Sequence, residues 1–175
     1  MKLLPFPRFT TQRLVIRQMT DTDDKAMSVL RSDEHVNQYI QRAGKIDKED
    51  ALAFIHKMNG NITQNQVFFW AICLKDDPEL IGTICLWNIS ADGETAEVGY
   101  DLMPAFHRQG IMSEALACVI DYSFAALGFN MLEAITHKDN KASIQLLEKH
   151  NFKLEPNRKF AGNADFIIYT LEAKR

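Results

Sequence analysis

Several features that would indicate other classes of protein are missing from this sequence of 175 residues. Its three cysteines, Cys73, Cys85 and Cys118, have no CxxC spacing and lie in apolar stretches, so we expect buried, reduced thiols in a cytoplasmic protein. No apolar run approaches eighteen residues, and Pro5 and Pro7 interrupt the apolar residues near the N-terminus. We therefore expect neither a transmembrane span nor a secretory signal.

Charge and nucleotide-binding motifs exclude further classes. A net charge of −3 offers no general attraction to nucleic acid or to an anionic membrane, so neither is an expected partner. The sequence contains neither GxxxxGK[ST] nor GxGxxG, which removes the main support for ATP or dinucleotide binding. Its histidines, cysteines and acidic residues show no metal-ligand spacing, so no metal is expected.

The hydrophobic pattern alternates between strand-like and helix-like segments. It predicts strands at 13–19, 67–74, 80–89, 95–103, 131–137 and 166–171, and helices at 25–30, 46–62, 111–127 and 140–150. Gly128 and Asn151 follow the last two helices, where a left-handed residue commonly ends a helix. Residues 68–70 and Trp87 are expected in the sheet core. No repeat or linker occurs, so we predict a single α/β domain, 1–175, with a mixed, mainly antiparallel central sheet flanked by helices.

One segment combines a strand, a basic loop and a helix start. The strand 95–103 stops at Pro104, His107 and Arg108 follow, and a helix begins after Gly110. Free N–H groups at a helix N-terminus attract anions, and a glycine lets a ligand approach the backbone closely. The same pattern would also fit an exposed turn without a ligand. The segment by itself fits a phosphate site and an exposed turn equally well.

The segment Pro104-Ala105-Phe106-His107-Arg108-Gln109-Gly110-Ile111-Met112-Ser113-Glu114-Ala115 resembles the pyrophosphate-binding motif of the GCN5-related N-acetyltransferase (GNAT) superfamily. The resemblance is strongest to the RimJ/RimL-like ribosomal-protein alanine acetyltransferases. Three further segments agree in order along the chain: Thr11-Gln12-Arg13-Leu14, Glu97-Val98-Gly99-Tyr100, and His137–Ser143 with Leu146–Phe152. Some positions depart from the pattern: His107 takes its first place, Arg108 and Asn151 replace frequent glycines, and Leu147 replaces the frequent general-acid tyrosine.

The resemblance implies the acyl-CoA N-acyltransferase fold and a site for acetyl-CoA, the co-substrate. The pantetheine arm would lie against the end of the strand 95–103. The residues implied in coenzyme binding are Asp101, Leu102, Met103, His107, Arg108, Gln109, Gly110, Ile111, Met112, Ser113 and Asn140. For Asn140, helix capping is an alternative to coenzyme contact, and it can do both.

Direct transfer to an amine requires a neutral nucleophile and, for the departing thiolate, a proton. Glu97 is the leading candidate for the base, acting through water, and Asp101 is a weaker one; Glu97 is otherwise a solvated strand residue. Ser143 is the candidate proton donor, with a helix-cap role as its alternative. Because Leu147 stands where the family frequently has a tyrosine, the general-acid role of that tyrosine cannot be assigned to this position.

The acceptor is an amine of unidentified structure. A protein N-terminal α-amine is the first hypothesis, followed by a small-molecule amine such as a polyamine, amino sugar or amino acid, and by an acetyl-CoA-binding module without turnover. The loops 37–48 and 156–165 are the expected acceptor loops and carry no readable motif. The expected assembly is a monomer or a homodimer.

Overall fold

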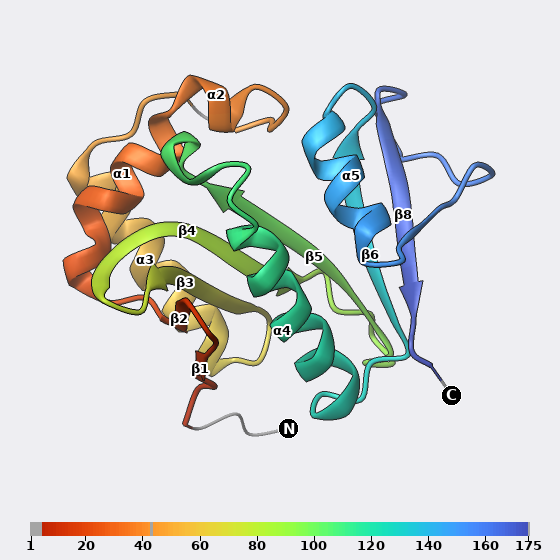
Figure 1. Cartoon of the computed structure of the whole chain (residues 1–175), viewed down its shortest axis with the longest axis horizontal. Helices are drawn as coiled ribbons and strands as arrows, with labels where there is room; N and C mark the ends of the chain where they lie inside the picture. Colours follow the sequence, from red (N-terminus) through yellow and green to blue (C-terminus); the bar gives the residue numbers. More distant parts are fainter. Residues whose placement is uncertain (1–4, 43, 175) are drawn as a thin grey trace. The chain divides into compact units, whose positions relative to one another are not determined.

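A computed structural model describes residues 5–42 and 44–174 of the chain. The elements are ordered along it as shown in Figure 1: β1 (Phe9–Thr10), β2 (Leu14–Gln18), η1 (Asp21–Asp23), α1 (Asp24–Ser32), α2 (Glu34–Asn37), α3 (Lys48–Thr63), β3 (Phe68–Leu74), β4 (Asp77–Trp87), β5 (Thr95–Leu102), η2 (Pro104–Phe106), α4 (Ile111–Ala125), β6 (Met131–His137), α5 (Lys141–Lys149), β7 (Lys153–Leu154) and β8 (Phe166–Glu172).

Hydrogen bonding orders the strands β1-β2-β3-β4-β5-β6-β8-β7. The pair β5–β6 is parallel, whereas β1–β2, β2–β3, β6–β8 and β7–β8 are antiparallel. The predicted α/β class with a mixed, mainly antiparallel sheet and flanking helices is thus confirmed.

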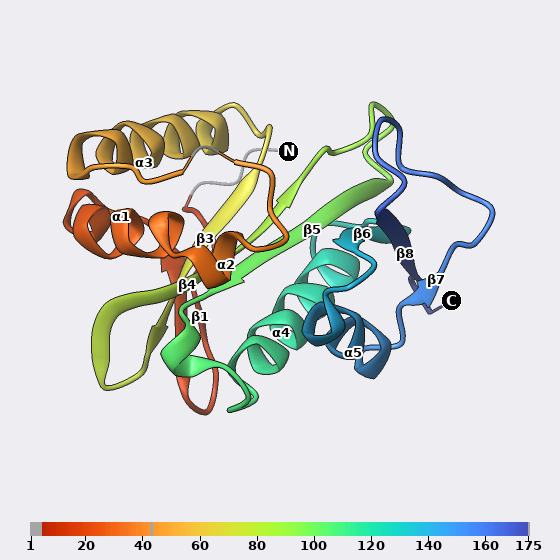
Figure 2. The same ribbon diagram turned by 90° about the horizontal axis from the view of Figure 1, so that it is seen from above.

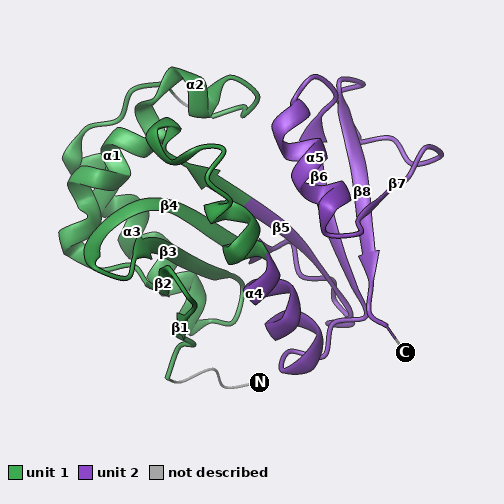
Figure 3. Cartoon of the chain, in the orientation of Figure 1, with its two compact units in different colours: residues 1–85, 100–116 green, residues 86–99, 117–175 purple. Residues whose placement is uncertain are grey.

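The chain divides into two compact units, coloured separately in Figure 3. Unit 1 comprises residues 1–85 and 100–116, and unit 2 comprises residues 86–99 and 117–175. The division passes through β4, β5 and α4, so neither unit is a continuous stretch of sequence.

In unit 1, helices α1 and α3 lie side by side over one face of the strands, and the start of α4 lies over the other face (Figure 2). Apolar residues from α1, α3, β3 and β4, together with Met19 just after β2, form the core beneath the two helices: Met19, Ala26, Met27, Leu30, Ala51, Ile55, Ala71, Cys73 and Leu80. Asp47 caps α3 in a capping box with Asp50, which fixes where this helix begins.

In unit 2, β6 is the central strand. It pairs with β8 at seven positions, Met131↔Glu172 to His137↔Phe166, and with β5 at three positions that end at Glu97↔Glu133. Helix α5 packs against β6 through Leu147, which is fully buried, and the Tyr169 hydroxyl on β8 donates to Glu148 on this helix. The edge strand β7 completes this part of the sheet.

The predicted strands and helices are all present within a few residues of their expected bounds. Gly128 (φ 75°) and Asn151 (φ 65°) adopt the left-handed conformation expected after α4 and α5. Five short elements, β1, η1, α2, η2 and β7, were not predicted. The placement of Trp87 in the sheet core is wrong: it lies at the end of β4 and is 45% exposed, whereas Trp70 is fully buried.

The cysteines agree with the expectation of free thiols: Cys73 is buried, and Cys85 and Cys118 are partly buried. Burial raises the pKa of the Cys73 thiol and that of the Cys118 thiol. None of the helices in the described part of the chain combines the length and apolar character that a bilayer-spanning segment needs.

Candidate functional site

The carboxyl end of β5 lies unusually close to β4. The Met103 amide donates to the Ile81 carbonyl oxygen at 2.9 Å. A Cβ atom at Gly82 would lie 2.5 Å from the Asp101 carbonyl oxygen, closer than real Cβ contacts, so this approach requires glycine. The backbone of Asp101, Leu102 and Met103, which the sequence assigned to pantetheine binding, is therefore firmly positioned against β4.

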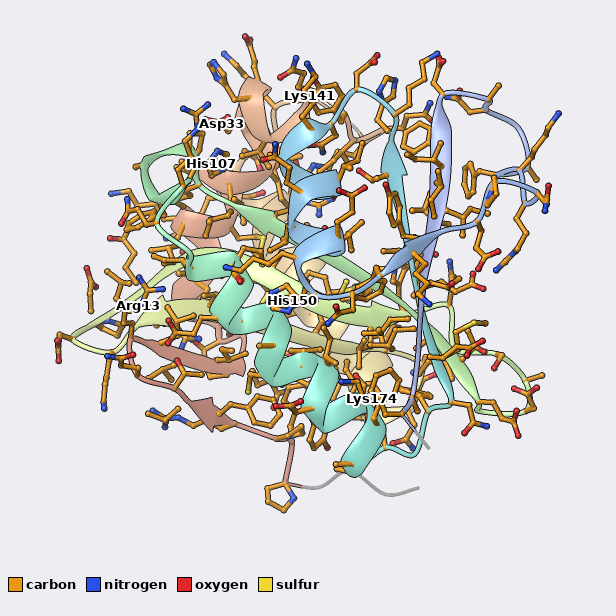
Figure 4. All side chains as sticks on the ribbon, turned by 45° about the vertical axis from the view of Figure 1, so that its right-hand side comes forward. Arg13, Asp33, His107, Lys141, His150 and Lys174 are labelled. Atoms are coloured by element: carbon orange, nitrogen blue, oxygen red, sulfur yellow. The ribbon has the colours of Figure 1, made fainter. Side chains whose placement is uncertain are left out.

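The loop between β5 and α4 is held by its own side chains. His107 Nε2 donates to the Leu102 carbonyl oxygen at 2.8 Å, and Gln109 Nε2 donates to the Ala105 carbonyl oxygen at 2.9 Å. Figure 4 labels His107 in this loop. These two side chains thus have a structural role that sequence reasoning, which treated His107 as a phosphate donor, did not foresee.

Two residues of the loop have left-handed backbone conformations, Arg108 (φ 60°) and Gly110 (φ 74°). A non-glycine residue in this region costs about 1–2 kcal/mol. This explains why the resembling motif often has glycine where this chain has Arg108. Retention of an exposed arginine at a strained position is consistent with a role for its charge.

Helix α4 begins directly after the loop. The Glu114 amide donates to the Gly110 carbonyl oxygen, so the amides of residues 111–113 precede the first intrahelical hydrogen bond. Ile111 and Met112 are buried, which leaves only their backbone to face a ligand. The loop and the first turn of α4 therefore fit an anionic group such as a pyrophosphate, with Arg108 as the neighbouring cation.

A hydrogen-bonded clamp, formed by Thr11, Arg13 and Glu114, holds the start of α4. Thr11 Oγ1 donates to Glu114 Oε1 at 2.6 Å, and the Arg13 amide donates to the same oxygen at 2.9 Å. Arg13 Nε donates to Glu114 Oε2 at 2.7 Å, and its Nη1 donates to the Gln109 carbonyl oxygen at 2.8 Å. Burial alone would raise the pKa of Glu114, but the bonds from Thr11 and Arg13 together lower it below its ordinary value.

The sequence did not predict this clamp, although both segments that form it belong to the family resemblance. In the sequence, Thr11 and Arg13 belong to one segment of the family resemblance and Glu114 to another, and no local pattern joins the two segments. The signal that could have suggested the contact is the pair Thr11 and Arg13, together with Glu114 at the fourth position after Gly110. Figure 4 labels Arg13.

Glu97 lies in unit 2, at the last position of the parallel β5–β6 ladder. Its Oε2 accepts a hydrogen bond from Asn88 Nδ2 at 2.8 Å. Burial raises the pKa of Glu97; the Asn88 hydrogen bond opposes this rise, and the carboxylate of Glu133 on β6 adds to it. Arg158 binds Glu133 with both Nη atoms, at 2.6 and 3.2 Å. Glu97 is thus a half-buried carboxyl group that is bound by an asparagine.

Asn140 and Ser143 also lie in unit 2, at the start of α5. Asn140 is the N-cap, and its Oδ1 accepts a hydrogen bond from the Ser143 amide at 3.1 Å. The capping role considered for Asn140 is therefore present, and its Nδ2 is the group that could meet a coenzyme. Leu147 belongs to the core, so the position of the family's frequent tyrosine carries no proton donor.

The side chain of Asp101 is bound by an arginine. Its Oδ2 accepts a hydrogen bond from Arg42 Nη1 at 2.8 Å, and both side chains are nearly buried. Because the carboxylate of Asp101 is already bound by Arg42, Glu97 is favoured over Asp101 as the base.

The predicted residues thus fall into two groups. Unit 1 brings together the end of β5 and the loop with the start of α4, and unit 2 contains Glu97, Asn140 and Ser143. Among residues 5–42 and 44–174, no group of three or more histidine, cysteine or acidic side chains is arranged to hold a metal ion.

Comparison with known proteins identifies the family. A family model described as an acetyltransferase (GNAT) domain matches residues 13–153. The uncharacterized N-acetyltransferase YoaA of Bacillus subtilis (strain 168) is 34% identical over 150 residues, covering 86% of this chain and 85% of the relative.

Solved structures share the fold at lower identity. Ribosomal-protein-S5-alanine acetyltransferase from Vibrio fischeri has a TM-score of 0.81 at 19% identity, covering 95% of this chain and 96% of the other. RimJ of Mycobacterium smegmatis, solved with a CoA-disulfide, has a TM-score of 0.80 at 19% identity, covering 91% of this chain and 82% of the other. With the family model spanning most of the chain and a relative above 30% identity, this protein belongs to the GNAT family of acetyl-CoA-dependent N-acetyltransferases.

Proposed function

We propose that this enzyme transfers the acetyl group of acetyl-CoA directly to a protein N-terminal α-amine. The observation that carries the proposal is Glu97, a half-buried carboxyl group whose pKa burial raises. An α-amine has a pKa near 8 and a lysine amine one near 10.4, so a carboxylate base can deprotonate an α-amine more readily. The names of the RimJ and S5-alanine acetyltransferase structures, which share the fold, also support this choice.

The loop and the first turn of α4 would hold the pyrophosphate of the coenzyme. Backbone amides at the start of α4 would donate to the phosphate oxygens, and Arg108 would supply a positive charge beside them. The clamp keeps the helix start in place. The backbone of residues 101–103 would bind the pantetheine arm, and one of its N–H groups would face the thioester oxygen. Attack on a thioester builds negative charge on that oxygen, and removing one such donor costs roughly 3 kcal/mol in studied enzymes.

Glu97 would remove the proton from the attacking amine through water. Burial raises the pKa of Glu97 towards the pKa of the amine, which increases its strength as a base. Asn88 would orient the carboxylate through the hydrogen bond to Oε2.

Ser143 would return a proton to the thiolate of coenzyme A when the carbon–sulfur bond breaks. Its amide is held by the Asn140 cap, which fixes the start of α5 and with it the position of the serine. Asn140 Nδ2 would donate to a carbonyl oxygen of the pantetheine arm.

The decisive experiment replaces Glu97 by glutamine, which keeps the shape of the side chain but cannot accept the proton. Acetyl-CoA consumption with a peptide acceptor should fall by roughly 10²–10⁴-fold at neutral pH, with the affinity for acetyl-CoA little changed. Raising the pH should recover part of the rate, because the fraction of neutral amine grows. Glu94→Gln, which removes an exposed carboxylate three residues away, is the matched control.

Two further measurements separate the parts of the proposal. A saturating concentration of acetyl-CoA should raise the melting temperature of the wild type, and no shift together with no heat of binding would contradict the coenzyme site. The defect of Ser143→Ala should shrink with acyl donors whose thiolate is a better leaving group. A Glu97→Gln enzyme with the wild-type rate across neutral pH would show that Glu97 is only a strand residue.

A further inference from the structure

A second polar cluster lies in unit 1, where α2 and the loop after it approach the carboxyl end of β5 (Figure 1). We call it the Arg42 cluster; it consists of Arg31, Asn37, Arg42 and Asp101. Arg42 Nη1 donates to Asp101 Oδ2 at 2.8 Å, and Arg42 Nε donates to Asn37 Oδ1 at 2.5 Å. Asn37 Nδ2 in turn donates to the Arg31 carbonyl oxygen at 2.7 Å.

Arg42 has one donor more than the described residues satisfy. Its side chain is 11% exposed, and its Nη2 is buried without a hydrogen-bond partner among the described residues. Leaving a buried polar group of this kind unsatisfied is costly, and charged groups cost more than neutral ones. An oxygen acceptor from a bound molecule would satisfy this nitrogen.

The charge of the cluster also favours an oxygen ligand. Two guanidinium groups, Arg31 and Arg42, interact electrostatically with the carboxylate of Asp101. Arg31 stacks on Phe54, with Cζ 4.0 Å from the ring centroid. Burial lowers the pKa of Arg31, the charge of Arg42 lowers it further, and Asp101 opposes both. The cluster thus holds an excess of positive charge in a poorly solvated place, which attracts carbonyl or carboxylate oxygen and repels a polyamine.

The position of Asp101 connects this cluster to the reaction. Asp101 belongs to the backbone segment 101–103, where the proposed function places the thioester. An oxygen bound by Arg42 would therefore belong to the acceptor beside the acetyl group. In an α-amine of a peptide or an amino acid, the nearest oxygen is on the carbon next to Cα, within reach of a group that also positions the amine.

We propose that Arg42 is an acceptor-specificity residue that binds, through Nη2, the carbonyl or carboxylate oxygen next to the reacting α-amine. It selects α-amino acceptors over lysine side chains and polyamines, which lack an oxygen at that distance. Asp101 and Asn37 are positioning residues, because they bind Nη1 and Nε and leave Nη2 for the acceptor oxygen. The inference rests on the proposed function only for the location of the thioester.

The test compares amines with and without the oxygen. Wild type and Arg42→Met are assayed for thiol release with an N-terminal alanine peptide, alaninamide, free alanine and isopropylamine, which lacks the carbonyl group. Arg42→Met should lower kcat/KM about 10- to 100-fold for the oxygen-bearing amines, the usual effect of a lost charged hydrogen bond, and less than about threefold for isopropylamine. The ratio of variant to wild type for each amine cancels differences in intrinsic reactivity.

The arms also identify the source of the oxygen. If Arg42→Met lowers kcat/KM more for alaninamide and the peptide than for free alanine, the ligand is a peptide carbonyl oxygen. If Arg42→Met lowers kcat/KM most for free alanine, the ligand is a carboxylate. The Michaelis constant for acetyl-CoA should remain unchanged in both cases, which a general disturbance of the active site would not allow.

Two variants keep the test decisive. Arg17→Met removes an arginine of the same unit that is paired by two 2.8 Å bonds with Asp23, and it should affect all four amines equally. If Arg42→Met does not fold because Asp101 is left unpaired, Arg42→Met combined with Asp101→Asn removes both charges. Equal losses for all amines, or none, would overturn the inference; absence of turnover in the wild type would instead overturn the proposed function.

Discussion

The clamp of Thr11, Arg13 and Glu114 provides a prediction whose size follows from three hydrogen bonds. In Glu114→Gln, the amide oxygen can replace Oε1 and still accept from Thr11 Oγ1 and from the Arg13 amide. The amide nitrogen replaces Oε2 and faces Arg13 Nε, which is also a donor, so this bond is lost. The substitution therefore removes one charged hydrogen bond and leaves the volume of the side chain unchanged.

A hydrogen bond to a charged group contributes about 1.5–3 kcal/mol, but the Arg13 side chain is 44% exposed, and solvent screens such pairs. We therefore expect a loss of about 1–2 kcal/mol in the free energy of unfolding. In a chain of this size, this corresponds to a decrease of roughly 2–8 °C in melting temperature. The affinity for acetyl-CoA should also fall, because the clamp holds the helix start and the Gln109 carbonyl oxygen.

The pH dependence gives an independent check. The bonds from Thr11 and Arg13 lower the pKa of Glu114 in the folded protein, so the stability they contribute is fully present above the unfolded pKa and is lost as the pH falls through the folded pKa. The difference in melting temperature between wild type and Glu114→Gln should therefore shrink on acidification. Asp121→Asn, which removes an exposed carboxylate from the same helix, is the control. Equal melting temperatures and equal acetyl-CoA affinities at neutral pH would refute the clamp.

Three other substitutions test separate features of the site. Arg108→Gly should relieve the left-handed strain, offset in part by the unfolded-state entropy of glycine, so thermal denaturation should show no loss of stability. Calorimetry should show a loss of acetyl-CoA affinity relative to wild type that is larger at low salt than at high salt. Glu97→Gln should melt higher than wild type at neutral pH and equally at acid pH, because a carboxyl group with a raised folded pKa loses stability as it ionises; a lower melting temperature at neutral pH would contradict the raised pKa. Asn140→Ala should cost about 1 kcal/mol of stability by loss of the cap, and an unchanged melting temperature would argue against the hydrogen bond to Ser143.

Local signals in the sequence were sufficient for the regular elements. The apolar stripe of α4 and the left-handed Gly128 define that helix without reference to other parts of the chain, and Asn140 and Asn151 do so for α5. These features act over one or two turns, within the range that periodicity and capping describe. The short elements β1, η1, α2, η2 and β7 were not predicted, because two to four residues carry too little periodicity and depend on their neighbours.

Trp87 illustrates the limit for burial. An aromatic residue in a strand is usually buried, and Trp70 follows this rule. Trp87 ends β4, and its exposure depends on what covers the end of that strand, which no local pattern records. A sequence predicts which residues can form a core, whereas the packing of other elements decides which of them are covered.

The sequence by itself determined the α/β class, the order of the elements, the loop before α4 and the resemblance to the N-acetyltransferases, because each is written in contiguous residues. Only the tertiary structure decided the contacts that hold the site: Glu114 meets Arg13 across 101 positions, and Arg42 meets Asp101 across 59. It also decided the environment of Glu97, whose pKa depends on Asn88 and on Glu133 of a neighbouring strand. Charge, burial and hydrogen bonding act through space, so residues that are remote in the chain set the chemistry of a group that the sequence can only nominate.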